Sequence, residues 1–257
     1  MRYEIRAMSF GEILDTGFRV VRNHFGLLVG IASLVYLPLA LLTAVASIGP
    51  AVAASTALLV AAIPTILFAL VAEPIVTAAA TFAVGELYLG RSPSFADALR
   101  VSFAIILPLL GTSLLAWLCI AGGFVLLIVP GVYLAFAFIL IRQIMVLERV
   151  FGVAALRRSR ELMRGNLWRG AGILFVGVLI ANVLAGVLQL ALRFVPFIGP
   201  LATGLAQAAS AAYVSTVGVL LYFDIRCRKE GFDVEHLARL VQAQGAPAGA
   251  APLAPVS

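Results

Sequence analysis

The sequence predicts an all-α membrane protein with six transmembrane helices, arranged as three repeats of an interfacial amphipathic helix plus a helical hairpin. Three observations lead to this fold class. Apolar residues make up 63% of the 257 residues and charged residues only 12%, as in helical membrane proteins. Residues 101–141 contain no charged side chain and are about twice as long as one helix across a bilayer core of about 30 Å. Finally, three basic segments of similar design each precede a pair of apolar runs.

The apolar runs define the expected order of elements along the chain. The six spans are expected at about 25–48, 57–84, 101–121, 124–147, 168–192 and 201–223. Spans three and four divide the uncharged stretch, with a tight turn at Gly122-Gly123. Pro38 and Pro74 lie inside spans one and two, where neighbouring helices can satisfy the freed carbonyl groups and a kink is expected.

The segments that flank the spans have distinct compositions. Residues 1–24 carry acidic and basic side chains before the first apolar run, which predicts a cytoplasmic interfacial helix rather than a cleaved secretory signal. After the last span, Gly231 is expected to end the helix, and residues 224–243 form a cytoplasmic amphipathic segment. Residues 244–257 are mostly Ala, Pro and Gly, which predicts a disordered tail.

The positions of Lys and Arg predict the orientation. Segments 49–56 and 120–124 contain neither residue, whereas the opposite ends of the spans carry nearly all of the basic side chains. Basic residues accumulate in cytoplasmic loops, so both termini are expected in the cytoplasm. The same distribution argues against nucleic-acid binding, because the basic residues lie between apolar runs and not along one continuous face.

The three basic segments resemble one another. Aligning them places Leu14 with Leu99 and Leu156, and Gly17 with Ser102 and Ser159, so the shared element is Leu-x-x-small. Ser94 is the expected N-cap of the second segment. Two spans per repeat keep every copy in the same orientation. The alternative is that any interfacial helix before a span has this amphipathic pattern.

Glu73 is the foremost candidate for a functional residue, because it falls near the middle of span two. An ionised carboxylate there costs several kcal/mol unless it is paired, protonated or hydrated. It is a candidate proton site, cation site or head-group contact. Alternatively, it is protonated and bonds to a neighbouring helix beside the Pro74 kink, or the span is shifted so that Glu73 lies nearer an interface. Asn182, Gln189 and Gln207 complete the candidate intramembrane polar site, although such residues commonly hold helices together.

The basic segment at 149–169 provides candidate contacts to anionic lipids. The candidates are Arg157, Arg158, Arg160, Arg164 and Arg169. Each basic side chain near an anionic membrane surface contributes about 1 kcal/mol. The alternative is that this segment serves only as the orientation signal.

No catalytic or metal-ligating constellation is recognisable. The two histidines, His24 and His236, have no partners at ligand spacing, and the chain contains no G-x-S-x-G, P-loop or Cys-x-x-Cys motif. These observations predict no metal, no cofactor and no catalytic residue. Cys119 and Cys227 are expected at opposite sides of the membrane, too far apart for a disulfide.

Several sequence motifs resemble a known family. They are Phe10-Gly-Glu-Ile-Leu-Asp-Thr-Gly-Phe18, then Pro130-Gly-Val-Tyr-Leu134 followed by Glu148 and Ala155-Leu-Arg-Arg-Ser159, and finally Leu221-Tyr-Phe-Asp-Ile-Arg-Cys-Arg-Lys-Glu-Gly-Phe-Asp233. They are similar to bacterial integral-membrane proteins grouped with the membrane domain of glycerophosphoryl diester phosphodiesterases, over about residues 9–235. The resemblance implies a bacterial inner-membrane protein. It does not carry phosphodiesterase activity over, because nothing here matches the separate catalytic barrel domain of the fused members.

The expected function is therefore a non-enzymatic scaffold or accessory module that contacts membrane lipids or an unidentified protein partner. The alternative is a small transporter or flippase-like protein that uses Glu73 in a central cavity. An intramembrane lipid enzyme is a third class, which the missing catalytic constellation disfavours.

Overall fold

The computed structural model describes residues 6–48, 54–192, 198–232 and 234, and every regular element within these ranges is a helix. The predicted all-α class is confirmed. In chain order the elements are α1 (Phe10–Asn23), α2 (Phe25–Ile48), α3 (Ala54–Tyr88), α4 (Phe95–Ala104), α5 (Ile106–Leu126), α6 (Ile128–Ala137), α7 (Ile141–Gln143), the π-helix η1 (Ile144–Glu148), α8 (Gly152–Met163), α9 (Leu167–Leu192) and α10 (Ile198–Glu230). The predicted tail at 244–257 lies outside the described residues, as do the predicted amphipathic segment beyond residue 234 and residues 49–53 and 193–197.

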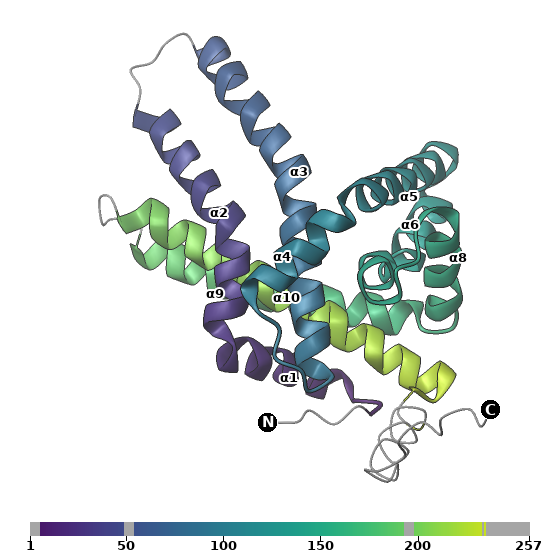
Figure 1. The fold of residues 1–257 in the computed structure, drawn as a ribbon. Helices are drawn as coiled ribbons and strands as arrows, with labels where there is room; N and C mark the ends of the chain where they lie inside the picture. Colours follow the sequence, from purple (N-terminus) through teal and green to yellow (C-terminus); the bar gives the residue numbers. More distant parts are fainter. Residues whose placement is uncertain (1–5, 49–53, 193–197, 233, 235–257) are drawn as a thin grey trace, which may run out of the picture.

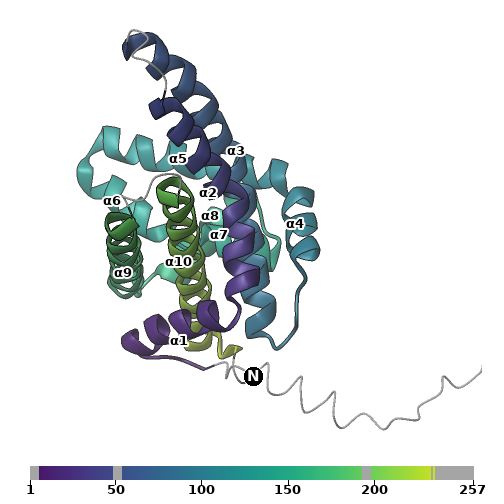
Figure 2. The same ribbon diagram turned by 90° about the vertical axis from the view of Figure 1, so that its left-hand side faces the viewer.

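Three helical arms diverge from a common centre (Figure 1). In each arm two helices pack side by side, and the pairs are α2 with α3, α5 with α6, and α9 with α10. A short helix precedes each arm: α1, α4 and α8 respectively. Helix α10 crosses the centre, where it contacts α1, α2, α3 and α8 (Figures 1 and 2). The buried core follows this helix and includes Tyr222, Leu220 and Ile13.

Several helices are long and apolar enough to cross a membrane. In the described part of the chain there are four such stretches: Ile106–Leu126, Ile128–Glu148, Leu167–Ala191 and Gly199–Glu230. A fifth results if α1 and residues Phe25–Leu41 of α2, which meet at an angle of 87°, are counted as one bent span. Helices α2 and α3 cover the first two predicted spans. The prediction of a membrane protein is therefore supported at the level of four or five apolar helices.

The three short helices begin in different ways. Ser9 and Glu12 form a capping box at α1, and Ser94 and Asp97 form one at α4, where Ser94 is the N-cap as predicted. A capping box satisfies amide groups that lack a partner within the helix. A hydrogen bond from Arg6, together with bonds from Ser9, lowers the pKa of Glu12 to about 2. Helix α8 has no such cap.

The short helices nevertheless share their buried positions. The small residues of the Leu-x-x-small element are all buried, and so are the residues four positions earlier. The two sets are Gly17, Ser102 and Ser159, and Ile13, Ala98 and Ala155. Small residues let a helix approach its neighbour closely: a Cβ on Gly17 would lie 3.1 Å from Val217 of α10. Ser159 donates a hydrogen bond of 2.8 Å to the Ala137 carbonyl.

The turn in the uncharged stretch lies at Leu127 and not at Gly122-Gly123. Helix α5 continues through both glycines, and Leu127 is extended, with φ −164° and ψ 152°. The physical reason is the close crossing of α5 and α6. A Cβ on Gly123 would lie 3.0 Å from the Gly131 Cα, so Gly123 serves helix packing instead of chain reversal.

Gly204 provides a test of the contact between α10 and α2. It is buried, and a Cβ there would lie 3.0 Å from the Tyr36 carbonyl oxygen and 3.1 Å from Leu37 Cδ2. Gly204→Val should lower the free energy of unfolding by about 1–3 kcal/mol, since the rigid backbone of α2 cannot move aside. The measurement is thermal unfolding of the purified protein in detergent. Gly186→Val is the matched control because Gly186 is exposed and faces open space. Equal shifts in the two variants would contradict the close contact.

Candidate functional site

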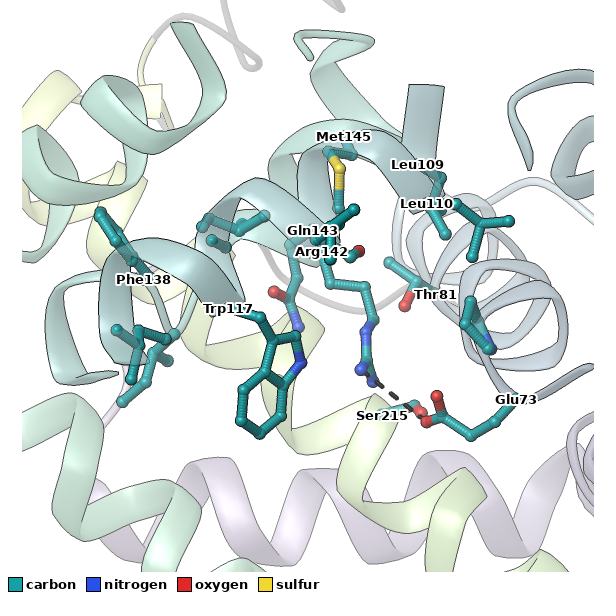
Figure 3. A pocket seen from close by; sticks show the side chains of 18 of the residues that line it. Glu73, Thr81, Leu109, Leu110, Trp117, Phe138, Arg142, Gln143, Met145 and Ser215 are labelled. Carbon is teal, nitrogen blue, oxygen red and sulfur yellow. Dashed lines mark ion pairs between the residues drawn. The ribbon is translucent and has the colours of Figure 1, made fainter. Parts of the chain in front are cut away.

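A cavity of about 1060 Å³ lies between α3, α5, the segment 138–145, α9 and α10 (Figure 3). Most of its lining is apolar, and the remainder is a small group of polar side chains. These polar residues are Glu73, Thr81, Ser113, Arg142, Gln143 and Ser215. Leu114 and Trp117 also line it and are 62% and 71% exposed, so the mouth opens onto the apolar outer surface of the helices. An apolar cavity with a few convergent polar groups is the usual form of a small-molecule site.

Glu73 of α3 and Arg142 of α7 face each other across the cavity (Figure 3). The Arg142 Nη2 atom is 3.8 Å from Glu73 Oε1. Arg142 is therefore an ion-pair partner of Glu73. A tight charge-assisted hydrogen bond measures about 2.7–2.9 Å, so this ion pair is loose. Both side chains are partly exposed to the cavity and retain capacity to bind a further group.

The helix that carries Arg142 is broken. Helix α6 ends at Ala137, α7 holds only three residues, and the π-helix η1 ends next to Arg149, whose φ is +57°. Within a membrane, irregular backbone is tolerated where protein buries it or where it lines a cavity. Discontinuous helices form substrate sites in many transporters, and π-helical turns are frequent at functional sites. The break therefore favours a binding role for the side chains that it presents.

Gln143 is the most unusual residue of this segment. It is only 7% exposed, and its Oε1 atom is buried without a hydrogen-bond partner in the described part of the chain. A Cβ at Gly218 would come within 2.5 Å of Gln143 Nε2, so the glycine on α10 makes room for the amide. A buried acceptor without a donor costs about 1–3 kcal/mol. Gln143 is therefore a buried polar residue in the cavity wall, and its Oε1 atom has almost no surface exposed to the cavity.

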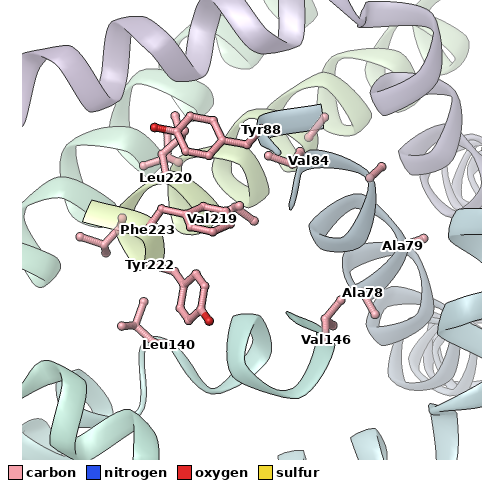
Figure 4. Packing of buried hydrophobic residues seen from close by; sticks show 14 of the residues in the cluster. Ala78, Ala79, Val84, Tyr88, Leu140, Val146, Val219, Leu220, Tyr222 and Phe223 are labelled. Carbon is pink, nitrogen blue, oxygen red and sulfur yellow. The ribbon is translucent and has the colours of Figure 1, made fainter. Parts of the chain in front are cut away.

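Apolar packing fixes the broken helix between α3 and α10 (Figure 4). Leu140 and Val146 are buried in the same cluster as Ala78 of α3 and Tyr222 of α10. The aromatic ring of Phe223 stacks on Tyr88 with the centroids 5.0 Å apart. Buried contacts on one side of the segment thus hold Arg142 and Gln143 against the cavity on the other side.

A charged network holds the far end of the segment. Glu148 accepts hydrogen bonds from Arg158 Nε at 3.0 Å and from the Tyr222 hydroxyl at 2.8 Å. Arg158 also pairs with Glu230 of α10 at 2.5 Å. These bonds to Glu230 and Glu148 raise the pKa of Arg158 above its ordinary value. Arg158 is therefore part of the scaffold that joins α8, η1 and α10.

A second network surrounds Asp224, which is fully buried. Asp224 accepts hydrogen bonds from the Met8 amide at 2.8 Å and from Arg169 Nε at 3.1 Å. Arg228 donates to the same carboxylate at 3.0 Å. Both arginines also donate to the Met8 carbonyl, at 2.6 and 2.8 Å. Arg169 thus joins the segment before α1 to α9 and α10, a structural role that the sequence did not suggest.

The remaining predicted lipid contacts stay on the surface. Arg157 and Arg164 are exposed. Arg160 is also exposed; it donates a hydrogen bond of 3.2 Å to the Tyr133 hydroxyl and lies over the ring, 5.7 Å from its centroid. These three arginines remain available to a membrane surface.

The predicted intramembrane polar site is not assembled as one group. Only Glu73 lines the cavity. Asn182 and Gln207 are exposed on α9 and α10, and Gln189 is partly exposed. The Asn182 side chain donates to the Val178 carbonyl of its own helix at 2.7 Å. Sequence reasoning missed Gln143 and the pairing of Arg142. Their one signal is their position at the end of the uncharged stretch.

Comparisons with known proteins add no assignment to this site. No protein-family model, curated protein or solved structure matches the chain. Within residues 6–48, 54–192, 198–232 and 234, no group of three His, Cys, Asp or Glu side chains could hold a metal ion. The resemblance to the phosphodiesterase membrane domain stays a prediction, and the functional argument depends on the cavity itself.

Gln143→Leu tests whether the buried acceptor lowers the free energy of unfolding. Leucine removes the buried acceptor while keeping a similar volume, so the free energy of unfolding in lipid-free detergent should rise by about 1–3 kcal/mol. Thermal unfolding measures this change. Gln207→Leu, on an exposed face of α10, should stay within about 0.5 kcal/mol of the parent protein. A loss of stability in Gln143→Leu would contradict an unsatisfied acceptor.

Proposed function

We propose that this chain is a non-enzymatic integral membrane protein that binds an amphipathic lipid in the cavity between its helical arms, as a scaffold or accessory module. The observation that carries the proposal is the loose Glu73–Arg142 ion pair in a cavity whose lining is mostly apolar. Its volume of about 1060 Å³ is at the upper end of the range for small-molecule sites. It suits a polar head group with the adjoining parts of its chains.

The proposed topology has six spans and both termini in the cytoplasm of a bacterial cell, with the protein in the inner membrane. Helices α2 and α3 supply the two spans beyond the apolar pairs α5–α6 and α9–α10. Three repeats of a short helix plus a hairpin are supported by the element order. They are also supported by the matching burial of Ile13, Ala98 and Ala155. Basic side chains on α8 would then face the cytoplasm.

The surface arginines extend the proposed contact with lipids. Arg157, Arg160 and Arg164 are exposed on or next to α8, which would lie at the cytoplasmic interface. There they would attract anionic head groups. The proposal includes a protein partner that binds the same surface. It also includes membership of the phosphodiesterase membrane-domain family, without phosphodiesterase activity.

Filling the cavity should displace the lipid. Ser215→Phe places an aromatic ring in the cavity from α10. After purification in the same detergent, this variant should retain at least about tenfold less lipid than the parent protein, as expected for a loss of about 1.4 kcal/mol in binding free energy. Native mass spectrometry of the detergent-purified protein measures the bound fraction. Val187→Phe, on an exposed face of α9, is the control. If both variants retain as much lipid as the parent protein, the cavity is not the binding site.

A transporter or flippase-like role is the second candidate function, favoured by the ion pair that crosses the cavity. In this role Glu73→Gln should slow movement of an acyl-labelled phospholipid between liposome leaflets about tenfold, since a charge in a low-dielectric site is removed. Glu161→Gln, exposed on α8, is the control. Equal rates for Glu73→Gln and the parent protein would contradict the transport role, and lipid binding would remain as the proposed function.

A further inference from the structure

We propose that the cavity selects a phospholipid whose head group carries both a phosphate and a primary ammonium group. This inference rests on the proposed lipid-binding function and adds the chemical class of the ligand. The cavity lining includes one cationic and one anionic side chain, Arg142 and Glu73, which lie 3.8 Å apart. A zwitterionic head group of this kind complements both.

Arg142 is the group that fits the phosphate. Its guanidinium presents up to five N–H donors in a planar fork that matches phosphate oxygens. Within the described residues, Arg142 forms an ion pair with Glu73, and this contact is loose at 3.8 Å. Most of its donors are therefore free to turn toward a ligand. The side chain is about half exposed and enters the cavity from the broken helix (Figure 3).

Glu73 is the group that fits the ammonium. The Glu73 carboxylate accepts hydrogen bonds and attracts a cation, and its side chain is partly exposed. A primary ammonium supplies three N–H donors. A quaternary ammonium has no N–H group and cannot donate a hydrogen bond to this carboxylate. An anionic head group without an amine would bring a second negative charge toward Glu73.

The apolar wall indicates where the acyl chains leave the cavity. Leu110, Leu114 and Trp117 of α5 line it at i, i+4 and i+7, so they share one face of the helix. Leu114 and Trp117 are largely exposed, which continues this face out of the mouth into the surrounding apolar medium. A lipid bound with its head group at Arg142 can therefore keep its chains along α5.

The test is a lipid titration of the purified full-length protein, followed by native mass spectrometry. The probes are phosphatidylethanolamine, phosphatidylcholine and phosphatidylglycerol with identical acyl chains. The parent protein should bind phosphatidylethanolamine about tenfold more tightly than phosphatidylcholine, as expected for one charge-assisted hydrogen bond in a cavity shielded from water. Glu73→Gln should reduce this preference, whereas Arg142→Gln should weaken binding of all three lipids. Glu161→Gln and Arg100→Gln, both on exposed positions, should leave the preference unchanged.

The outcomes separate this inference from the proposed function. Equal affinity of the parent protein for phosphatidylethanolamine and phosphatidylcholine, or tighter binding of phosphatidylglycerol, would overturn the head-group assignment. If Ser215→Phe still abolished retention in that case, lipid binding in the cavity would stand. If no probe bound in a saturable way, the proposed function would fail together with the inference. The preference of the parent protein decides the result even where a variant does not fold.

Discussion

The absence of water as a hydrogen-bonding partner in hydrocarbon is the constraint from which the rest of this structure follows. Every backbone amide and carbonyl at membrane depth needs a partner from the protein, which explains why the described elements are all helical. The same constraint makes the break at α6, α7 and η1 informative. An interruption of this kind persists only when neighbouring side chains bury it, and the cluster around Leu140 and Val146 does so.

Electrostatic pairing divides the charged residues into two classes. Arg158 and Arg169 pair with carboxylates in networks that join distant parts of the chain. These pairs fix the positions of α8, α9 and α10 relative to one another. The Glu73–Arg142 pair differs because it is loose and faces a cavity. Removing one partner of a buried pair leaves the other charge uncompensated, so the first class stabilises the scaffold while the second is available for binding.

Apolar patterning was sufficient to predict the class of fold and most of the helices. The first predicted span, 25–48, coincides with α2, and Ser94 caps α4. Glu73 was recognisable because an acid within an apolar run is costly. Its partner was not, since Arg142 lies far away in sequence. The unsatisfied Gln143 acceptor depends on packing against Gly218 of α10, and the structural roles of Arg158 and Arg169 depend on Glu148 and Asp224. Contacts of this kind leave no periodic signal in a single sequence.

The start of α8 shows how the arms depend on one another. Without a cap of its own, this helix has its first amide, that of Gly152, bonded to Thr112 Oγ1 of α5 at 2.7 Å. The Met8–Asp224 bond likewise joins the beginning of the chain to its last long helix. During biosynthesis neither bond can form until the later segment has left the ribosome. The contact between the start of the chain and α10 can therefore form only after residue 224 has been synthesised.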